Sequence, residues 1–357
     1  MNSRGSRSPN GMTVDGLDDG TLLERARTGD EGAFGELVEA HRGELRAYCY
    51  RMLGSVTDAE DAVQNALLRA WKGLAGFEGR SPVRSWLYSI ATNTALDMLK
   101  HRSRRELPTG FGPAAPSGAP LAEAVTDPVW LEPYPDRWLN DALASPEARY
   151  EQRESVELAF MVMLQEMPPL QRAVLILRDV MGFSAAEASG QLGTSVAAVN
   201  SALQRARQSA AADLPRRSQQ SALRALGGEG ARDLARRYAD AMEAGDVDTL
   251  LGMLTEDATW SMPPIPTWFR GHDTLRPWLL RDPLPLRWRH HRARVNGQLA
   301  VGCYLHDGER SCYTPAVIDV LTLSGDKIAA VTAFLVMDDP GRAGFFARFG
   351  LPAELPA

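Results

Sequence analysis

Polar residues that could contact DNA lie in the segment FSAAEASGQLGTSVAAVNSALQRARQ, residues 183–208. Ser184 and Glu187 have the spacing of a capping box, Gly193 suits a tight turn, and Ser195 can N-cap a second helix. This pattern predicts a helix-turn-helix, whose second helix enters the major groove of a DNA duplex. The alternative is an ordinary helical hairpin with a solvated polar face. We expect a core side of Val196, Val199 and Leu203, and DNA contacts from Ser195, Ala197, Ala198, Asn200, Ser201, Gln204, Arg205 and Arg207.

A second group of cations and aromatic residues lies in residues 81–105. Aromatic faces stack on unpaired bases and cations follow the phosphate backbone, so this composition suits a single strand of nucleic acid. Trp86 also shares helical spacing with Leu87, Ile90 and Ala91, so burial in a core is the alternative for its ring. The cations are Arg84, Lys100, Arg102, Arg104 and Arg105, opposed by Asp97, with Trp86 and Tyr88 between them.

A third polar surface is expected on the helix DAEDAVQNALLRAWK, residues 58–72. Thr57 and Glu60 predict a capping box at its start, and Ser81 with Pro82 predicts the N-terminus of the following helix. The side of the helix away from its apolar residues is either a solvated face or a docking site. It presents Asp61, Gln64, Asn65 and Arg69, with Trp71 at its end.

Changes in composition divide the chain into parts that could position these residues. Four helices are expected in the first part, and two helices followed by strands in the last. Between them lies a segment with eight prolines and seven acidic residues against two arginines, which is typical of an extended linker. The predicted order is a disordered tail (1–20), a helical domain (21–105), an acidic Pro-rich linker (106–150), a second helical domain (151–217), a joint (218–230) and an α+β domain (231–357).

Overall composition narrows the class of protein. The chain has 357 residues, a formal net charge of −6 and three cysteines, Cys49, Cys303 and Cys312. Three cysteines exclude a disulfide framework of several bridges, and their spacing excludes a Cys-x-x-Cys metal site. No apolar run reaches the roughly 18 residues that span a bilayer. We therefore expect a cytoplasmic protein with no membrane partner and no bound metal or cofactor.

The two helical parts together resemble a sigma-70 family factor of the extracytoplasmic function subfamily, over residues 20–215. DAEDAVQNALLRAWK is similar to the region 2 helix that binds core RNA polymerase, and SWLYSIATNTALDMLK to the promoter-melting segment, with Asn93 and Asp97 at its Asn-x-x-x-Asp positions. Residues 168–207 resemble region 4, which recognises the -35 element. Family members often have a lysine at the position of Asn200, so we expect fewer phosphate contacts here.

The resemblance implies core RNA polymerase and promoter DNA as partners, and no catalytic activity. Free protein is expected to bind DNA poorly until polymerase separates and orients the two modules. The implied polymerase contacts are Asp58, Asp61, Gln64, Asn65, Leu68 and Trp71. The implied contacts to the melted -10 strand are Arg84, Trp86, Tyr88, Asn93, Asp97, Lys100, Arg102 and Arg104.

The run WLEPYPD, residues 130–136, is similar to a sigma G-like subgroup that carries a C-terminal SnoaL-like domain. This implies a multidomain fold: two all-α sigma domains followed by an α+β cone of the ketosteroid-isomerase type around a pocket. Such folds include enzymes and binding modules. An enzyme would need an acid or base in the pocket, and the available residues are Asp257, His272, His290, His291, Tyr304, Tyr313 and Asp319.

None of these residues belongs to a catalytic motif, and His290 and His291 are strand neighbours that point to opposite faces. We therefore expect the domain to regulate the factor, with a small-molecule ligand as a candidate partner. A two-residue turn at Asp307 and Gly308 would also place Cys303 opposite Cys312, as a redox pair or as two free thiols. The alternatives for the whole chain are a conventional helix-turn-helix regulator and a bifunctional protein with an enzymatic C-terminal domain.

Overall fold

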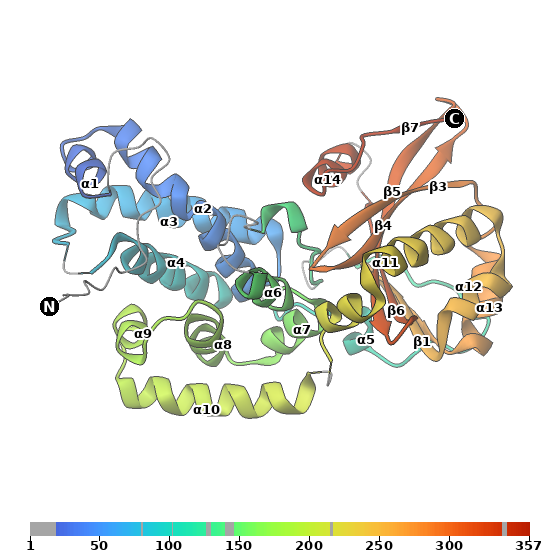
Figure 1. The fold of residues 1–357 in the computed structure, drawn as a ribbon, viewed down its shortest axis with the longest axis horizontal. Coiled ribbons are helices and arrows are strands. Elements are labelled where there is room, and N and C mark those ends of the chain that lie inside the picture. Colours follow the sequence, from blue (N-terminus) through green and yellow to red (C-terminus); the bar gives the residue numbers. More distant parts are fainter. Residues whose placement is uncertain are drawn as a thin grey trace, which may run out of the picture.

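The computed structural model describes residues 19–79, 81–101, 103–125, 130–139, 146–214, 217–337 and 341–357. Helices form one side of the molecule and a curved sheet with its own helices forms the other (Figure 1). No helix in these ranges is long and apolar enough to cross a membrane. The predicted tail, residues 1–20, lies outside the described residues except for Asp19 and Gly20, which begin the first helix.

The first four helices form a bundle, as the periodicity predicts. Asp30 N-caps α2, and Gly54 ends it in a left-handed conformation. The predicted capping box at Thr57 and Glu60 is wrong, because Ser55 N-caps α3 by accepting from the backbone of Asp58. The N-terminus of the next helix also differs by one residue, with Pro82 as the N-cap. The helices are α1 (Asp19–Arg27), α2 (Glu31–Leu53), α3 (Val56–Gly73) and α4 (Val83–Leu99).

The Pro-rich segment after α4 is extended, but it packs closely on the C-terminal domain. It contains α5 (Pro108–Phe111) and then follows strand β2 (Ile265–Arg270). The backbone N–H of Ala115 donates to Trp268 O at 2.8 Å, and that of Val125 donates to Pro264 O at 2.9 Å. The segment is therefore part of the wall of that domain.

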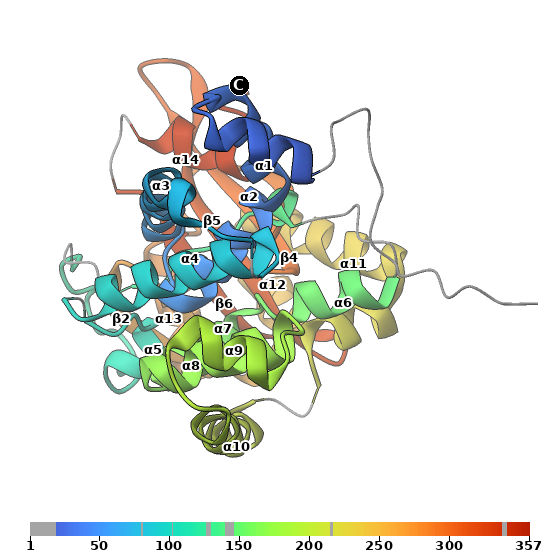
Figure 2. The same cartoon turned by 90° about the vertical axis from the view of Figure 1, so that its left-hand side faces the viewer.

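The second helical domain packs directly on the first. Its helix-turn-helix has the predicted capping box at Ser184 and Glu187, a left-handed Gly193 and an N-cap at Ser195. Helix α9 lies against α4. Helix α10 runs along the lower edge of the molecule in Figure 1 and is seen end-on, as the lowest element, in Figure 2. The helices are α6 (Pro146–Glu154), α7 (Leu158–Glu166), α8 (Pro169–Leu175), α9 (Ala185–Leu192) and α10 (Val196–Asp213), with a π-helical turn at Ile176–Val180.

The predicted joint at residues 218–230 is wrong, because it forms the start of a long helix, α11 (Gln219–Ala244). Ser218 N-caps this helix, and Gln219 and Gln220 are buried. A glycine within this segment, Gly227, adopts φ +75° and kinks the helix. The segment has the composition of a linker, but it is helical here, and the polar side chains of Gln219 and Gln220 are buried.

A curved sheet and three helices form the rest of the C-terminal domain. The elements are α12 (Val247–Met253), β1 (Leu254–Met262), β2, α13 (His272–Arg281), β3 (Trp288–Val295), β4 (Gln298–Asp307), β5 (Cys312–Ser324), β6 (Lys327–Leu335), α14 (Arg342–Arg348) and β7 (Leu355–Pro356). The strand order is β2-β1-β6-β5-β4-β3, with β7 added on β5. The sheet is antiparallel except where β1 pairs with β6.

The predicted cysteine pair is wrong. Asp307 pairs with Cys312, so the turn between β4 and β5 contains four residues, 308–311. The longer turn shifts the register, and Cys303 pairs with Val317. Cys303 is buried, whereas Cys312 is partly exposed. The structure therefore does not support a cross-strand redox pair.

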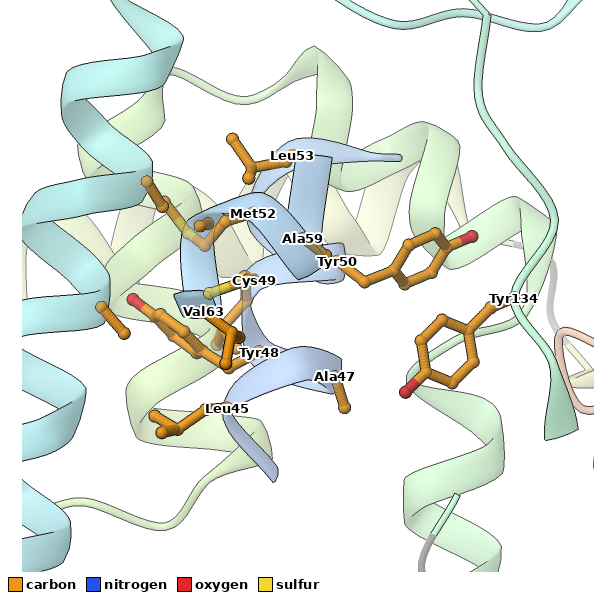
Figure 3. Packing of buried hydrophobic residues seen from close by; sticks show 14 of the residues in the cluster. Leu45, Ala47, Tyr48, Cys49, Tyr50, Met52, Leu53, Ala59, Val63 and Tyr134 are labelled. Atoms are coloured by element: carbon orange, nitrogen blue, oxygen red, sulfur yellow. The ribbon is translucent and has the colours of Figure 1, made fainter. Parts of the chain in front are cut away.

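Apolar packing is continuous between the helical domains and one face of the sheet. The cluster includes Leu45 and Tyr48 of α2, Leu177 of the second helical domain, and Ile318 and Phe334 of the sheet. Figure 3 shows Tyr50 of α2 facing Tyr134, and their ring centroids are 4.6 Å apart. A second cluster fills the other face of the sheet. The three domains thus share one core in addition to the internal core of the C-terminal domain.

Candidate nucleic-acid and polymerase interfaces

The second helix of the helix-turn-helix presents a polar face to solvent. Val199 and Leu203 face the core as predicted, but Val196 is 44% exposed, so its predicted burial is wrong. Arg207 forms two hydrogen bonds to Asp179, at 2.7 and 2.8 Å. Ala198 is half-buried, and the other predicted contact residues are exposed: Ser195, Ala197, Asn200, Ser201, Gln204, Arg205 and Arg207.

The start of α4 is in a different environment, because the helix-turn-helix domain covers it. Tyr88 is fully buried, and its ring packs edge-on against Phe183 with centroids 5.0 Å apart. The guanidinium of Arg84 lies over the ring of Phe183 at 4.8 Å and donates to Glu44 at 3.0 Å. Burial raises the pKa of Tyr88 well above its ordinary value. Two predicted -10 contacts therefore lie in an interdomain contact.

The remaining predicted -10 residues are more accessible. Trp86 is half-buried and stacks on Phe77 with centroids 4.4 Å apart. Asp97 pairs with Lys100 at 2.9 Å and Arg69 at 3.4 Å. These hydrogen bonds, from Lys100 first, lower the pKa of Asp97. Asn93, Lys100 and Arg104 are exposed, and Arg102 lies outside the described residues.

Helix α3 carries an exposed stripe at helical spacing. Four of the six predicted polymerase contacts are exposed on it. One of these four, Leu68, is apolar and yet 53% exposed. Asp58 is not available, because it is buried and ion-paired with Arg105 at 2.5 Å. Trp71 is half-buried against Phe34, with ring centroids 5.1 Å apart. The stripe consists of Asp61, Gln64, Asn65 and Leu68.

The WLEPYPD run is the junction between the first helical domain and the C-terminal domain. Glu132 caps the start of α3, where its carboxylate accepts from the backbone of Val56 at 2.9 Å. The backbone N–H of Tyr134 donates to Asn296 Oδ1 at 2.8 Å. The Asp136 carboxylate accepts from the backbone N–H of Gly297 at 2.7 Å. The resemblance drew attention to this run, but the sequence did not show its bonding partners.

Asn296, in the turn between β3 and β4, was not predicted as a functional residue. It is fully buried, and its Nδ2 donates to Tyr50 Oη of α2 at 2.9 Å and to Val156 O before α7 at 2.7 Å. A Cβ on the next residue, Gly297, would lie 2.8 Å from Arg153 O, so only glycine allows this approach. The Asn-Gly pair was a signal for a turn, and nothing in the sequence indicated its burial.

Two further buried groups join the domains. Glu157 accepts from the backbone N–H groups of Gln219 and Gln220 at 2.9 and 2.8 Å, and so caps α11 from the second helical domain. Burial, partly opposed by these hydrogen bonds, raises the pKa of Glu157 to about 7. Arg172 of α8 is buried and donates to Met52 O of α2 and to Gln165.

The C-terminal domain contains a cavity of about 210 Å³. Asp319 lines it and is buried, and the hydroxyl of Tyr238 donates to Asp319 Oδ2 at 2.8 Å. The other six candidate acid or base residues of the sequence are absent from its described wall. Among the described residues, no group of three or more His, Cys, Asp or Glu side chains could hold a metal ion.

Comparisons with known families match all three domains. Residues 37–105 match sigma-70 region 2, residues 157–209 match sigma-70 region 4, and residues 235–331 match the SnoaL-like domain. The chain is 42% identical over 330 residues to the ECF RNA polymerase sigma factor SigG of Mycobacterium tuberculosis, covering 91% of this chain and 85% of that protein. This chain belongs to the extracytoplasmic function sigma factors.

Other comparisons agree with this assignment. The sigma factor is 33% identical over 225 residues to SigJ of Mycobacterium tuberculosis, covering 62% of each protein. The crystal structure of SigJ has the same fold, with a TM-score of 0.55 and 24% identity over 88% of this chain and 98% of that one. The predicted fold class is confirmed, and the sigma role is favoured over a conventional helix-turn-helix regulator. As a sigma factor, the protein binds core RNA polymerase and promoter DNA.

Proposed function

We propose that the C-terminal domain regulates this sigma factor by holding regions 2 and 4 together. The observation that carries the proposal is the burial of Asn296, which bonds to region 2 through Tyr50, to the interdomain run through Tyr134 and to the start of region 4 through Val156. One side chain thus bonds to all three parts. In the closed arrangement, region 4 covers Arg84 and Tyr88.

We assign one binding partner to each of three surfaces. The face of α10 from Ser195 to Arg207 contacts the -35 duplex, where bases are recognised through hydrogen bonds in the major groove. The α4 segment from Arg84 to Arg104 engages the melted -10 strand through cations and aromatic rings. The exposed stripe of α3 docks on polymerase. Asp58 is left out of this surface because of its buried ion pair with Arg105.

We further propose that the protein acts in the cytoplasm and has no catalytic activity of its own. Asp319 is tied to Tyr238 and Cys303. His290 bonds to Glu243 at 3.2 Å and is not part of the described cavity wall. Asp282, the second acid among the described lining residues, is ion-paired with Arg281 at 2.8 Å. Both acids of the cavity wall are thus held by other side chains, which favours binding over turnover.

Run-off transcription with core polymerase tests the proposal. Full-length protein, Asn296→Ala and the exposed control Arg294→Ala are compared at equal concentration on promoters selected from genomic DNA. We expect the Asn296→Ala protein to initiate at least threefold more often than wild type at limiting polymerase, with Arg294→Ala unchanged. Equal transcription by all three proteins would refute regulation by closure, and no initiation at any promoter would refute the sigma role.

A further inference from the structure

The described residues that line the cavity of the C-terminal domain are mainly apolar, with two acids and the Cys303 thiol among them. The indole rings of Trp260, Trp278 and Trp288 form part of its wall. Asp282 also lines it, but is paired with Arg281 at 2.8 Å. Asp319 is 3% exposed and is the buried acid of this wall. A ligand in this space would contact aromatic faces and one buried carboxyl group.

The two oxygens of the Asp319 carboxyl differ in their surroundings. Tyr238 and Cys303 both donate to Oδ2, at 2.8 and 3.3 Å. Burial raises the pKa of Asp319 and so favours the protonated form, whereas these two hydrogen bonds act in the opposite direction. A protonated carboxyl has one O–H donor, and convergence of both bonds on Oδ2 leaves Oδ1 to meet a ligand.

Part of the cavity wall comes from outside the domain. Leu121 lines the cavity and belongs to the segment that connects regions 2 and 4. Side chains of the C-terminal domain bond to the backbone on either side of Leu121: Ala122 N–H donates to Thr267 Oγ1 at 2.8 Å, and Arg281 donates to Ala119 O at 2.9 Å. A molecule in the cavity therefore touches the interdomain segment directly.

We propose that this cavity binds a small uncharged molecule with one ring and one oxygen that accepts a hydrogen bond, and that binding fixes residues 112–125 on the C-terminal domain. An apolar cavity of roughly 150 Å³ accepts benzene, so about 210 Å³ holds a ring with a few more atoms. A charged molecule would lose its hydration without a fixed partner. The regulatory consequence, a stabilised closed form, rests on the function proposed above.

Calorimetry with full-length protein and matched probes tests the site. Acetophenone has the ring and the accepting oxygen, ethylbenzene lacks the oxygen, and 1-phenylethylammonium replaces it with a cation. We expect acetophenone to bind about three- to tenfold more tightly than ethylbenzene, as for one buried hydrogen bond, and the cation to give no detectable binding. Equal affinities for the first two, tightest binding of the cation, or no binding of acetophenone would overturn the proposal.

Three variants test the location of the site. Leu121→Trp fills the cavity from the connecting segment and should reduce acetophenone affinity at least tenfold, whereas Ala122→Trp, at an exposed neighbouring position, should leave it unchanged. Asp319→Leu should remove the preference for acetophenone over ethylbenzene. If Asp319→Leu fails to fold, the Leu121→Trp and Ala122→Trp pair still decides the matter, since equal affinities of those two variants contradict the site.

Hydrogen exchange tests the connection to the interdomain segment. Saturating acetophenone should slow exchange of the Ala122 and Val125 amides at least fivefold, and unchanged rates would overturn this part of the proposal. Transcription is measured separately. If acetophenone binds and slows exchange but leaves transcription unchanged, the site stands and the regulatory function fails; without binding, the site fails whatever transcription shows.

Discussion

The two candidate DNA surfaces of this sigma factor differ in accessibility. The outer face of α10 is open, with Asn200, Gln204 and Arg205 exposed. The start of α4 is closed, with Tyr88 at 0% exposure under Phe183. In the proposed assignment of surfaces, region 4 meets duplex DNA in this arrangement, whereas Tyr88 meets a single strand only after region 4 moves. We propose that this difference places control at the melted -10 strand.

The largest expected effect comes from breaking the junction that holds the closed form. Asn296→Ala removes the partner of the Tyr134 N–H and of the Val156 carbonyl, and one of the two partners of the Tyr50 hydroxyl, which still donates to Glu132 O. This should lower the free energy of unfolding by about 3–5 kcal/mol. Urea denaturation measures this, and small-angle scattering should show an expanded molecule. Asn93→Ala, at an exposed position, is the control and should change stability by less than about 0.5 kcal/mol.

A second prediction concerns pH. The pKa of Glu157 rises from its ordinary 4.5 to about 7 in the folded protein, so between these values the folded state binds a proton that the unfolded state has released. Stability should therefore fall as pH rises from about 4.5 to 7, by about 3 kcal/mol, and this contribution is flat above pH 7. Glu154 is the nearby like charge that adds to the shift.

Glu157→Gln isolates this contribution, because other buried acids such as Asp319 also titrate. Urea denaturation from pH 4.5 to 8 measures the free energy of unfolding of wild type and of Glu157→Gln. As pH rises, the value for wild type should fall relative to the value for the variant. A pH-independent difference would show that the carboxylate does not titrate at this junction.

A third prediction sharpens the contrast between the DNA surfaces. Arg205→Ala should weaken binding of a -35 duplex by the holoenzyme by about 1–3 kcal/mol, or roughly 5- to 150-fold. Arg84→Ala should leave duplex binding by the holoenzyme unchanged and weaken its capture of a -10 single strand. Fluorescence anisotropy with both probes measures this. A loss of duplex binding in Arg84→Ala would contradict the assignment of surfaces.

The smallest expected effect is at the edge of the open surface. Asp179→Asn weakens the bidentate partner of Arg207 and leaves that cation more available to a phosphate. Because exposed ion pairs contribute little, binding of the -35 duplex should improve by only about 0.2–1 kcal/mol. The slope of log affinity against log salt should steepen by about one unit, as expected for one more phosphate contact. Titrations at three salt concentrations measure the slope.

Local patterns predicted the elements well, and long-range contacts limited the rest. Ser184, Glu187, Gly193 and Ser195 define the helix-turn-helix because caps and turns depend on neighbouring residues. The prediction of a linker at residues 218–230 was wrong, because composition cannot show that Glu157, far away in the sequence, caps the helix there. Asp58 was likewise a predicted polymerase contact, and the sequence could not show its buried ion pair with Arg105.

The candidate sites show the same limit. The spacing in α3 was enough to predict the exposed face of Asp61, Gln64 and Asn65, since one helix face follows from periodicity. The exposure of the apolar Leu68 did not follow from that spacing. Asn296 could not be predicted, because its role arises from three segments that meet only in the folded chain. The turn between β4 and β5 likewise has four residues and not the two that were predicted, so Cys303 does not lie opposite Cys312.

The most direct test of the closed arrangement is the distance between regions 2 and 4 in single molecules. Dyes on Lys72→Cys in α3 and Gln208→Cys in α10, both exposed positions, report it by energy transfer in a Cys312→Ser background, since Cys49 and Cys303 are buried. We predict one high-transfer state for the free protein and a low-transfer state when core polymerase is added. The same transfer efficiency in both conditions would contradict closure as the regulated step.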